Sequence, residues 1–269
     1  TSIFNAKLDY ARSHGAYLFD MNRGVEFLDL FGLYSSLPLG YNHPVFDDPE
    51  FRREIVEASA VKVPNCEMAT EAGDRFLASF RNHASMAPFA EFHFSCTGAL
   101  AIEAALKTAW EYRRSRRPRA IVFRKSFHGI NAYGPMLTDR FESVAVRLDG
   151  FPDPTDPHLP NPVLGPGGSP APDGADVLQQ IDDRLTQDRD RDIVGVLVEP
   201  IQCTAGDLVM DPAFLRSLRA LCTRHDVPLI FDEVQTGFGG TGTMWYFEQL
   251  GFEPDIVTFG KKAQTSGMM

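Results

Sequence analysis

The protein is a chain of 269 residues, 43% of them hydrophobic, with a formal net charge of -10 at pH 7. This length suffices for one large core, or for one large domain and part of a second. The acidic balance argues against nucleic acid or an anionic membrane as a main partner. No apolar run approaches the length of a membrane span, and no signal peptide is expected at the start of the chain. Its four cysteines are scattered without a CxxC pair, which predicts a reduced, cytoplasmic protein without a disulfide framework or a metal site.

Short elements come first along the chain. Residues 16–34 predict short strands joined by a turn at Asn22-Arg23-Gly24, and residues 47–82 predict helices. From about residue 90, strands and helices alternate. The predicted strands are Glu91–Phe94, Ala120–Phe123, Val144–Leu148, Ile193–Val198, Pro228–Phe231 and Ile256–Phe259, and the predicted helices are residues 99–116, 174–189, 212–225 and 244–250.

This alternation predicts an α/β fold, with a mostly parallel sheet and helices on both of its faces. Several of the strands are continuous apolar runs, as expected when both faces of a sheet are covered. Residues 149–174 are rich in Pro, Gly and Asp and predict an irregular surface excursion. Ligands of such sheets bind at the carboxyl ends of the strands, so the chemistry is expected there.

The first strand end is a turn of small residues. An apolar strand enters Ser95-Cys96-Thr97-Gly98-Ala99, and a strong helix-forming segment follows. The first N–H groups of a helix and its dipole make an anion site, and Gly98 and Ala99 allow a phosphate to approach the backbone. A tight strand-to-helix turn in any α/β domain has the same appearance, so this segment alone leaves both interpretations open.

The second strand end carries two acids, Asp232 and Glu233, directly after Ile230-Phe231. A carboxylate in the ligand crevice is costly to bury unless a cation or a hydrogen-bond donor meets it. A protonated pyridine nitrogen is one such partner, and the carboxylate would keep that ring able to accept electrons. A metal-binding acid or a helix N-cap is the alternative for this segment.

The third strand end carries lysines, with Lys261 and Lys262 following the apolar run Ile256–Phe259. A desolvated lysine amine can form a Schiff base with a carbonyl, although a lysine after a strand is often a solvated loop residue. The three strand ends together are more specific than any one of them. A phosphate turn, a strand-end acid and a strand-end lysine, in this order, are the parts of a site for pyridoxal 5'-phosphate (PLP).

With these residues, the sequence resembles the class III (ω-amino acid) aminotransferases, which are PLP enzymes of fold type I. The segment Ile230-Phe231-Asp232-Glu233-Val234-Gln235-Thr236-Gly237-Phe238-Gly239 matches the most specific motif of that family. The resemblance implies that Asp232 pairs with the pyridine nitrogen, Val234 packs behind the ring and Gln235 bonds its phenolic oxygen. It also implies that Lys261 is the Schiff-base residue.

Further segments carry the same resemblance. Ser126-Phe127-His128-Gly129 is similar to the family's aromatic-His-Gly motif, and this implies that Phe127 stacks on the ring. Glu199, in Glu199-Pro200-Ile201-Gln202, is implied to reach the site. Tyr34, just before a segment similar to the family's N-terminal motif (Leu39–Pro44), is implied to line the substrate pocket.

The resemblance also implies a domain organisation. Residues 1–46 would form the N-terminal segment of a smaller α+β domain, and residues 47–269 the large PLP-binding domain. The chain ends at Gly267-Met268-Met269, soon after Lys261, so a C-terminal domain is expected to be absent from it. In the family, an arginine of that domain holds the substrate α-carboxylate. A threonine from the partner subunit contacts the phosphate, which implies a homodimer with a shared active site.

Within the class, the nearest likeness is to the L-lysine ε-aminotransferases, because of Gly98-Ala99-Leu100-Ala101 and Phe259-Gly260-Lys261-Lys262-Ala263-Gln264. Two positions depart from the family pattern. Ile130 stands where an arginine usually binds a substrate carboxylate, and Thr204 stands where a second glutamate usually moves aside for glutamate. An apolar side chain cannot make the bidentate carboxylate contact, so a shifted substrate range or a different amino acceptor is expected.

The function implied is transfer of an amino group from the terminal amine of lysine, or of a similar ω-amino or diamino compound, to a keto acid. Lys261 and Asp232 would be the catalytic residues. Another PLP reaction on the same fold, such as that of an aminomutase or a decarboxylase, is the alternative. A non-catalytic dimer or binding module is the third possibility, and loss of cofactor absorbance in Lys261→Ala would exclude it.

Overall fold

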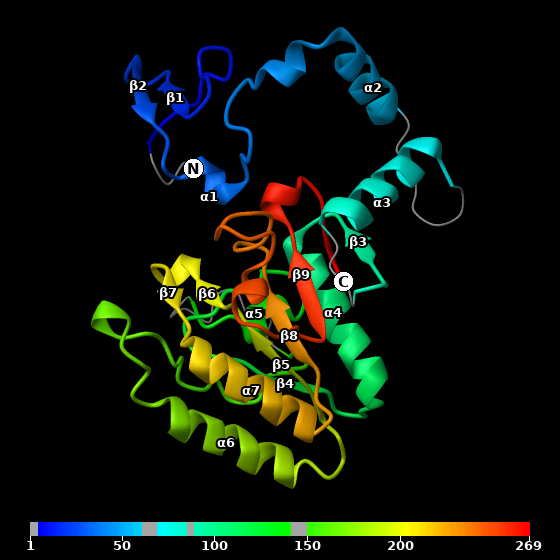
Figure 1. Cartoon of the computed structure of the whole chain (residues 1–269), viewed down its shortest axis with the longest axis vertical. Coiled ribbons are helices and arrows are strands. Elements are labelled where there is room, and N and C mark those ends of the chain that lie inside the picture. The colour runs from blue at the N-terminus through cyan, green and yellow to red at the C-terminus, as the bar shows by residue number, and fades with distance from the viewer. Residues whose placement is uncertain (1–4, 61–68, 85–88, 141–149) are drawn as a thin grey trace. The chain divides into compact units, whose positions relative to one another are not determined.

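The computed structural model describes residues 5–60, 69–84, 89–140 and 150–269 (Figure 1). The chain divides into two compact units, Thr1–Pro88 and Phe89–Met269. Compact units need not coincide with domains, so the domain boundary after residue 46 remains a prediction. The strand predicted at Val144–Leu148 lies outside the described residues.

The first unit begins with the predicted hairpin. Strands β1 (Tyr17–Asp20) and β2 (Val25–Leu28) pair antiparallel, and the buried Asp20 carboxylate accepts the backbone N–H of Asn22 at 2.9 Å inside the turn. The unit continues with the short α1 (Gly32–Ser35), the 3-10 turn η1 (Pro44–Asp47), α2 (Pro49–Ala60) and α3 (Glu71–His83). The predictions of a hairpin and of helices between residues 47 and 82 are therefore confirmed.

The second unit is built on a six-stranded sheet of order β3-β10-β9-β8-β5-β4. Strands β4, β5, β8 and β9 pair in parallel, and β10 runs antiparallel to both of its neighbours. All residues of β5, β8 and β9 are buried, which explains their continuous apolar sequences. The strands are β3 (His93–Ser95), β4 (Arg119–Ile121), β5 (Ile193–Val198), β8 (Leu229–Asp232), β9 (Ile256–Phe259) and β10 (Ser266–Met268).

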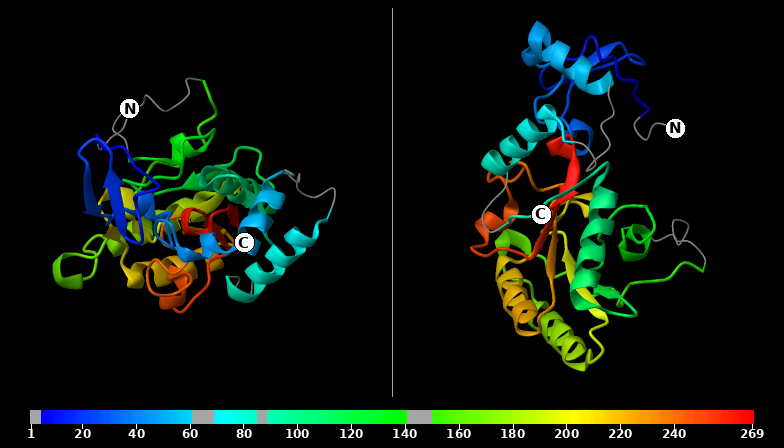
Figure 2. Two further views of the ribbon diagram at one scale, coloured as in Figure 1. Left: turned by 90° about the horizontal axis from the view of Figure 1, so that it is seen from above. Right: turned by 90° about the vertical axis from the view of Figure 1, so that its right-hand side faces the viewer.

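Helices cover both faces of this sheet, as predicted. In the right-hand view of Figure 2, α4 (Gly98–Arg113) lies on one side of the strands, and α6 (Gly174–Gln187) and α7 (Pro212–Arg224) lie on the other. Each helix buries one apolar stripe, such as Val177, Ile181 and Leu185 of α6, which are spaced by four residues. The fold is therefore that of a mostly parallel α/β domain, as expected from the sequence.

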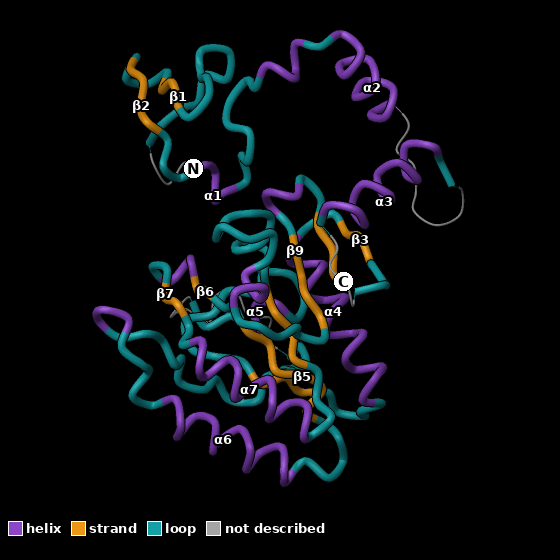
Figure 3. Tube along the Cα trace, in the orientation of Figure 1, coloured by secondary structure: helices purple, strands orange, loops and turns teal. Residues whose placement is uncertain are grey.

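Small elements fill the loops around the sheet (Figure 3). They are α5 (Gly134–Leu137), η3 (Pro166–Gly168), β6 (Ile201–Gln202), η4 (Cys203–Ala205), β7 (Leu208–Val209), η5 (Tyr246–Gln249) and η6 (Lys261–Ala263). The helix predicted at residues 244–250 is only the 3-10 turn η5. No helix within the described ranges is both long and apolar enough to cross a membrane.

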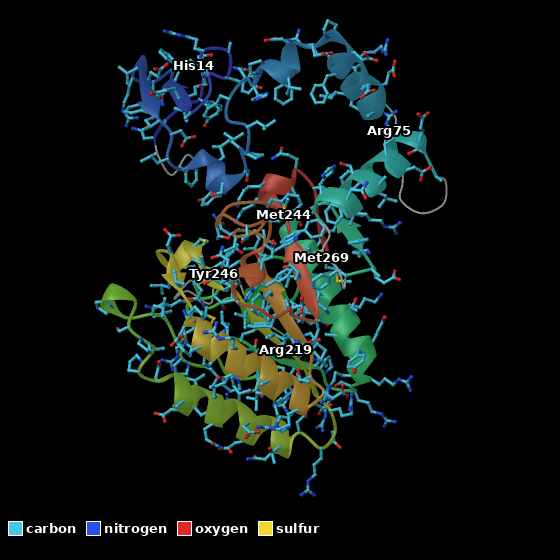
Figure 4. All side chains as sticks on the ribbon, in the orientation of Figure 1. His14, Arg75, Arg219, Met244, Tyr246 and Met269 are labelled. Atoms are coloured by element: carbon cyan, nitrogen blue, oxygen red, sulfur yellow. The ribbon has the colours of Figure 1, made fainter. Side chains whose placement is uncertain are left out.

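Strand β10 was not predicted from the sequence. It is short and contains Gly267, whose added Cβ would lie 2.3 Å from the His93 carbonyl oxygen, so only glycine fits between the neighbouring strands. Beyond it, Met269 exchanges two backbone hydrogen bonds with Val257, both 2.9 Å long (Figure 4 labels Met269). β10 thus turns the chain back along β9 directly after the two lysines.

Candidate active site

The turn after β3 packs directly against the segment after β8. Thr97 caps α4 by accepting the backbone N–H of Leu100 at 3.2 Å. A Cβ on Gly98 would lie 2.8 Å from a methyl carbon of Val234. Gly129 has a φ of +98°, and a Cβ there would lie 2.6 Å from that of Ala99. Three predicted positions, Gly98, Ala99 and Val234, are therefore in one place, together with the loop that follows Phe127.

Asp232 ends β8 as a buried carboxylate with three hydrogen-bond partners. Its Oδ2 lies 2.8 Å from Nδ1 of His128, which is itself fully buried. Its Oδ1 accepts the hydroxyl of Thr258 at 3.3 Å and the backbone N–H of Val234 at 3.2 Å. These contacts hold the carboxylate in one orientation at the strand end. When Asp232 is ionised, His128 donates Nδ1–H to it.

Lys261 follows β9 after a single glycine, in a left-handed backbone conformation with φ +48°. Its Nζ donates a hydrogen bond to the side-chain oxygen of Gln235. Burial lowers the pKa of the Lys261 amine, and the charge of Asp232 opposes this effect. The register of β8 and β9 pairs Asp232 with Thr258, so the two strands end side by side. Lys261 and Asp232 therefore face the same region, as a shared site requires.

Glu199 is a second buried carboxylate of the site. It follows β5, and its Oε2 accepts the backbone N–H of Phe127 at 2.8 Å. Burial, and next the charge of Asp232, raise the pKa of Glu199 well above its ordinary value, while the Phe127 N–H and Lys261 oppose this. Glu199 thus holds the backbone of Phe127, the predicted stacking residue.

Glu233, next to Asp232 in sequence, points away from these groups. It accepts the backbone N–H groups of Tyr246 at 2.7 Å and Phe247 at 3.1 Å, and the hydroxyl of Thr236 at 3.0 Å (Figure 4 labels Tyr246). Burial raises its pKa to about 7. The two acids of the motif therefore differ in role, because successive strand residues point to opposite faces, and Glu233 anchors η5.

Two residues of this cluster were not assigned from the sequence. His128 stands inside the aromatic-His-Gly motif, and its distance of 104 residues from Asp232 hides their contact. Thr258 has no distinctive sequence signal, and only the register of β8 and β9 shows that it lies beside Asp232.

Tyr34 belongs to the first unit and is 49% exposed there. Its predicted role in the substrate pocket stays a prediction.

The two departures from the family pattern are also on the second unit. The side chain of Ile130 is 65% exposed. The carbonyl oxygen of Thr204 accepts a hydrogen bond from Nε of Arg140. The Thr204 hydroxyl is buried, and no partner for it is found within the part of the chain that the structure describes.

Comparison with known proteins identifies the family of the chain. The family model for class-III aminotransferases matches residues 3–269, and the chain belongs to that family. This confirms the family predicted from the motifs, and PLP is the cofactor that its members use.

Among the members of this family, the chain is similar to L-lysine-epsilon aminotransferases. An L-lysine-epsilon aminotransferase of Mycobacterium tuberculosis is 37% identical over 97% of this chain, and that of Amycolatopsis lactamdurans is 33% identical over all of it. The solved structure of lysine aminotransferase from M. tuberculosis in the internal aldimine form superposes with a TM-score of 0.89 at 36% identity, over 98% of this chain and 63% of that one. The chain spans 61% and 62% of the lengths of the two curated relatives.

The residues present fit PLP. Lys261 offers an amine whose pKa is lowered by burial, and Asp232 offers a carboxylate held in place by His128 and Thr258. The α4 N-terminus offers backbone N–H groups at Gly98 and Ala99, where a helix leaves its first donors without intrahelical partners. An amine, an anion site and a carboxylate are the three groups that the carbonyl, the phosphate and the ring nitrogen of PLP require.

Proposed function

We propose that the protein transfers an amino group from the terminal amine of lysine, or of a similar ω-amino or diamino compound, to a keto acid. The observation that carries this proposal is the placement of Lys261 and Asp232 at the ends of the paired strands β9 and β8. Membership of the class-III aminotransferase family supports the reaction, and the similarity to L-lysine-epsilon aminotransferases supports the amino donor.

Each residue of the site has a role in this proposal. Lys261 would provide the amine for the Schiff base with PLP, and Asp232 would pair with the pyridine nitrogen. Gly98 and Ala99 would bind the phosphate. Phe127 and Val234 would hold the ring, and Gln235 would contact its phenolic oxygen. Tyr34 and Glu199 contribute to the substrate side, Glu199 at least by holding the backbone of Phe127.

The chain's own groups account for the proton movements. When bound, PLP supplies an electron sink for the carbanion formed at the reacting carbon. Burial lowers the pKa of Lys261, so a larger fraction of its amine is neutral and able to accept a proton from that carbon. The resulting ammonium can return the proton to a neighbouring position. Asp232, bonded by His128 and Thr258, keeps a negative charge available for the ring nitrogen.

The amino acceptor is proposed to differ from that of relatives that use glutamate and 2-oxoglutarate. Ile130 presents no donor to a carboxylate, and Thr204 has no charge that could pair with an arginine. Because of these two positions, the same experiment also tests a second reaction class, that of an aminomutase or a decarboxylase.

The assembly and location form part of the proposal. A homodimer with a shared active site is supported by the family resemblance. A cytoplasmic location is supported by the cysteines, because Cys96, Cys203 and Cys222 are free thiols in the structure.

The test is a screen of amino donors against several keto acids, with the full-length holoenzyme. Incubation of lysine with each keto acid should give one aminated acceptor for each lysine consumed, and Lys261→Ala should give none. Carbon dioxide release, or an isomerised amino acid without nitrogen transfer, would instead support the second reaction class. Absence of any reaction together with absence of bound cofactor would overturn the proposal.

A further inference from the structure

Lys261 and Lys262, the two consecutive lysines after β9, both donate a hydrogen bond to Gln235, but to different atoms of it. Lys261 Nζ donates to the side-chain oxygen of Gln235, and Lys262 Nζ donates to the main-chain oxygen of Gln235. The family role assigned to this stretch uses only Lys261. The second lysine therefore has a defined partner that the proposed reaction does not explain.

The end of the Lys262 side chain lies close to Gly240. A Cβ added to Gly240 would lie 2.8 Å from Cε and 3.1 Å from Nζ of Lys262. Burial, and next the charge of Lys261, lower the pKa of Lys262. An ordinary lysine after a strand keeps its ammonium in water, so this half-buried placement beside a second lysine requires compensation. The carbonyl oxygen of Gln235 provides it.

The segment that Lys262 contacts is already fixed on its other side. A Cβ on Gly237 would lie 2.6 Å from the indole of Trp245, and Thr236 donates its hydroxyl to Glu233 at 3.0 Å. Lys262 adds an anchor at Gln235, the residue directly before Thr236. With the backbone of Gln235 held, its side-chain amide has fewer positions available when it accepts from Lys261.

We propose that Lys262 is a positioning residue, which holds the backbone of Gln235 so that the Gln235 side chain orients the amine of Lys261. This inference rests on the proposed function of Lys261. It also separates the roles of two adjacent, chemically identical side chains. Lys261 forms the covalent link, and Lys262 acts through Gln235 without contacting substrate or cofactor.

The test compares Lys262→Met, Lys262→Arg and wild type as full-length holoenzymes. Lys262→Met keeps much of the side-chain volume and removes the donor. Loss of one hydrogen bond from a charged group should weaken PLP binding by roughly tenfold and change the visible absorbance and circular dichroism of the bound cofactor. Lys262→Arg keeps a charged donor and should restore most of both signals. Lys107→Met, at a side chain 74% exposed on α4, is the matched control and should match wild type.

A second variant, Gly240→Ala, keeps the inference testable if Lys262→Met fails to fold. Gly240→Ala retains Lys262 but places a methyl group 2.8 Å from its Cε and 3.0 Å from the Thr236 carbonyl oxygen. The Lys262 side chain and the adjoining Gln235-Thr236 backbone should both shift, so the same spectral change and weaker PLP binding are expected. Borohydride reduction and peptide mapping should find the cofactor on Lys261 in every variant. PLP affinity and spectra equal to wild type in both Lys262→Met and Gly240→Ala would overturn the inference. Wild type without cofactor on Lys261 would instead overturn the proposed function.

Discussion

The two ends of the sheet in the second unit both contain buried charges, but they differ in how these charges are compensated. At the amino ends of the strands, the Arg113 guanidinium lies 3.1 Å from an Asp188 carboxylate oxygen, and both side chains are less than 5% exposed. Arg113 also donates to the carbonyl oxygens of Ile193 and Asp226, at 3.1 Å and 2.9 Å. Asp188 in turn accepts the backbone N–H groups of Asp192 and Ile193.

At the carboxyl ends, two carboxylates and a lysine amine influence one another. Two carboxylates, Asp232 and Glu199, are close enough that one raises the pKa of the other, and burial lowers the pKa of Lys261. Removing one partner of a buried ion pair such as Arg113 and Asp188 is strongly destabilising. Buried groups whose pKa values are shifted within a ligand crevice are instead typical of functional sites. The comparison teaches that one end of the sheet is built for stability and the other for chemistry.

The largest effect is expected from Lys261→Ala, which should lower the rate of amino transfer by at least about a thousandfold because it removes both the covalent link and the proton carrier. The free energy of unfolding should not fall, since the variant removes a desolvated amine. Steady-state kinetics and urea unfolding measure the two quantities. The control is Lys107→Ala, an exposed lysine on α4. Transfer within tenfold of wild type would remove Lys261 from the mechanism.

Arg113→Met should have the opposite pattern, with lower stability and unchanged chemistry. Removing one partner of a buried ion pair leaves the Asp188 carboxylate without its cation and costs about 3–5 kcal/mol. Urea unfolding should report this loss, while kcat per folded molecule stays near wild type. Arg116→Met, at an exposed neighbouring position, should change stability by no more than about 0.5 kcal/mol. A lower kcat in fully folded Arg113→Met would contradict the assignment of stability to the amino ends of the strands and of chemistry to their carboxyl ends.

The pH dependence of stability at Glu233 provides a further test of the comparison. Its pKa is raised by burial from an ordinary 4.5 to about 7, so the folded state holds the proton more tightly than the unfolded state. Its contribution to stability is therefore fully present below pH 4.5 and is lost as the pH rises to 7. With about 1.4 kcal/mol for each pKa unit, the loss amounts to about 3 kcal/mol.

Glu233→Gln cannot ionise and should abolish this part of the pH dependence. Urea unfolding of both proteins at several pH values between 4.5 and 8 gives the difference between them. That difference should shrink as the pH rises, because only wild type loses stability at Glu233. A difference that stays constant over this range would show that the Glu233 carboxyl titrates normally.

The sequence predicted those parts of the site that lie within short contiguous segments. Gly98, Asp232 and Lys261 each follow an apolar strand, so the parallel topology alone places them at one edge. The rest depends on distant contacts. Glu233 directly follows β8 and still pairs its N–H with Thr258 of β9, so its side chain points away from that of Asp232. Its backbone partners lie in η5, a turn without a clear sequence pattern. Strand β10 was missed because three residues with a central glycine carry little strand signal.

The smallest effect is expected from substitution of His128, whose contact with Asp232 joins two segments that are distant in the sequence. Its Nδ1 bonds Asp232 at 2.8 Å, whereas its Nε2 is buried and has no hydrogen-bond partner within the described residues. Only one end of the ring therefore acts on the site. His128→Asn places an amide donor near the position of Nδ1, and His128→Phe fills the space without a donor.

His128→Phe should lower kcat by roughly tenfold, since the buried Asp232 carboxylate loses one charge-assisted hydrogen bond. His128→Asn should remain within a few-fold of wild type, although it leaves more of the ring volume empty. A purely structural role would give the reverse order, because Phe conserves the packing and Asn does not. The ranking of the two variants in kcat, with cofactor absorbance measured on the same samples, therefore decides whether His128 acts through the Asp232 charge or through packing.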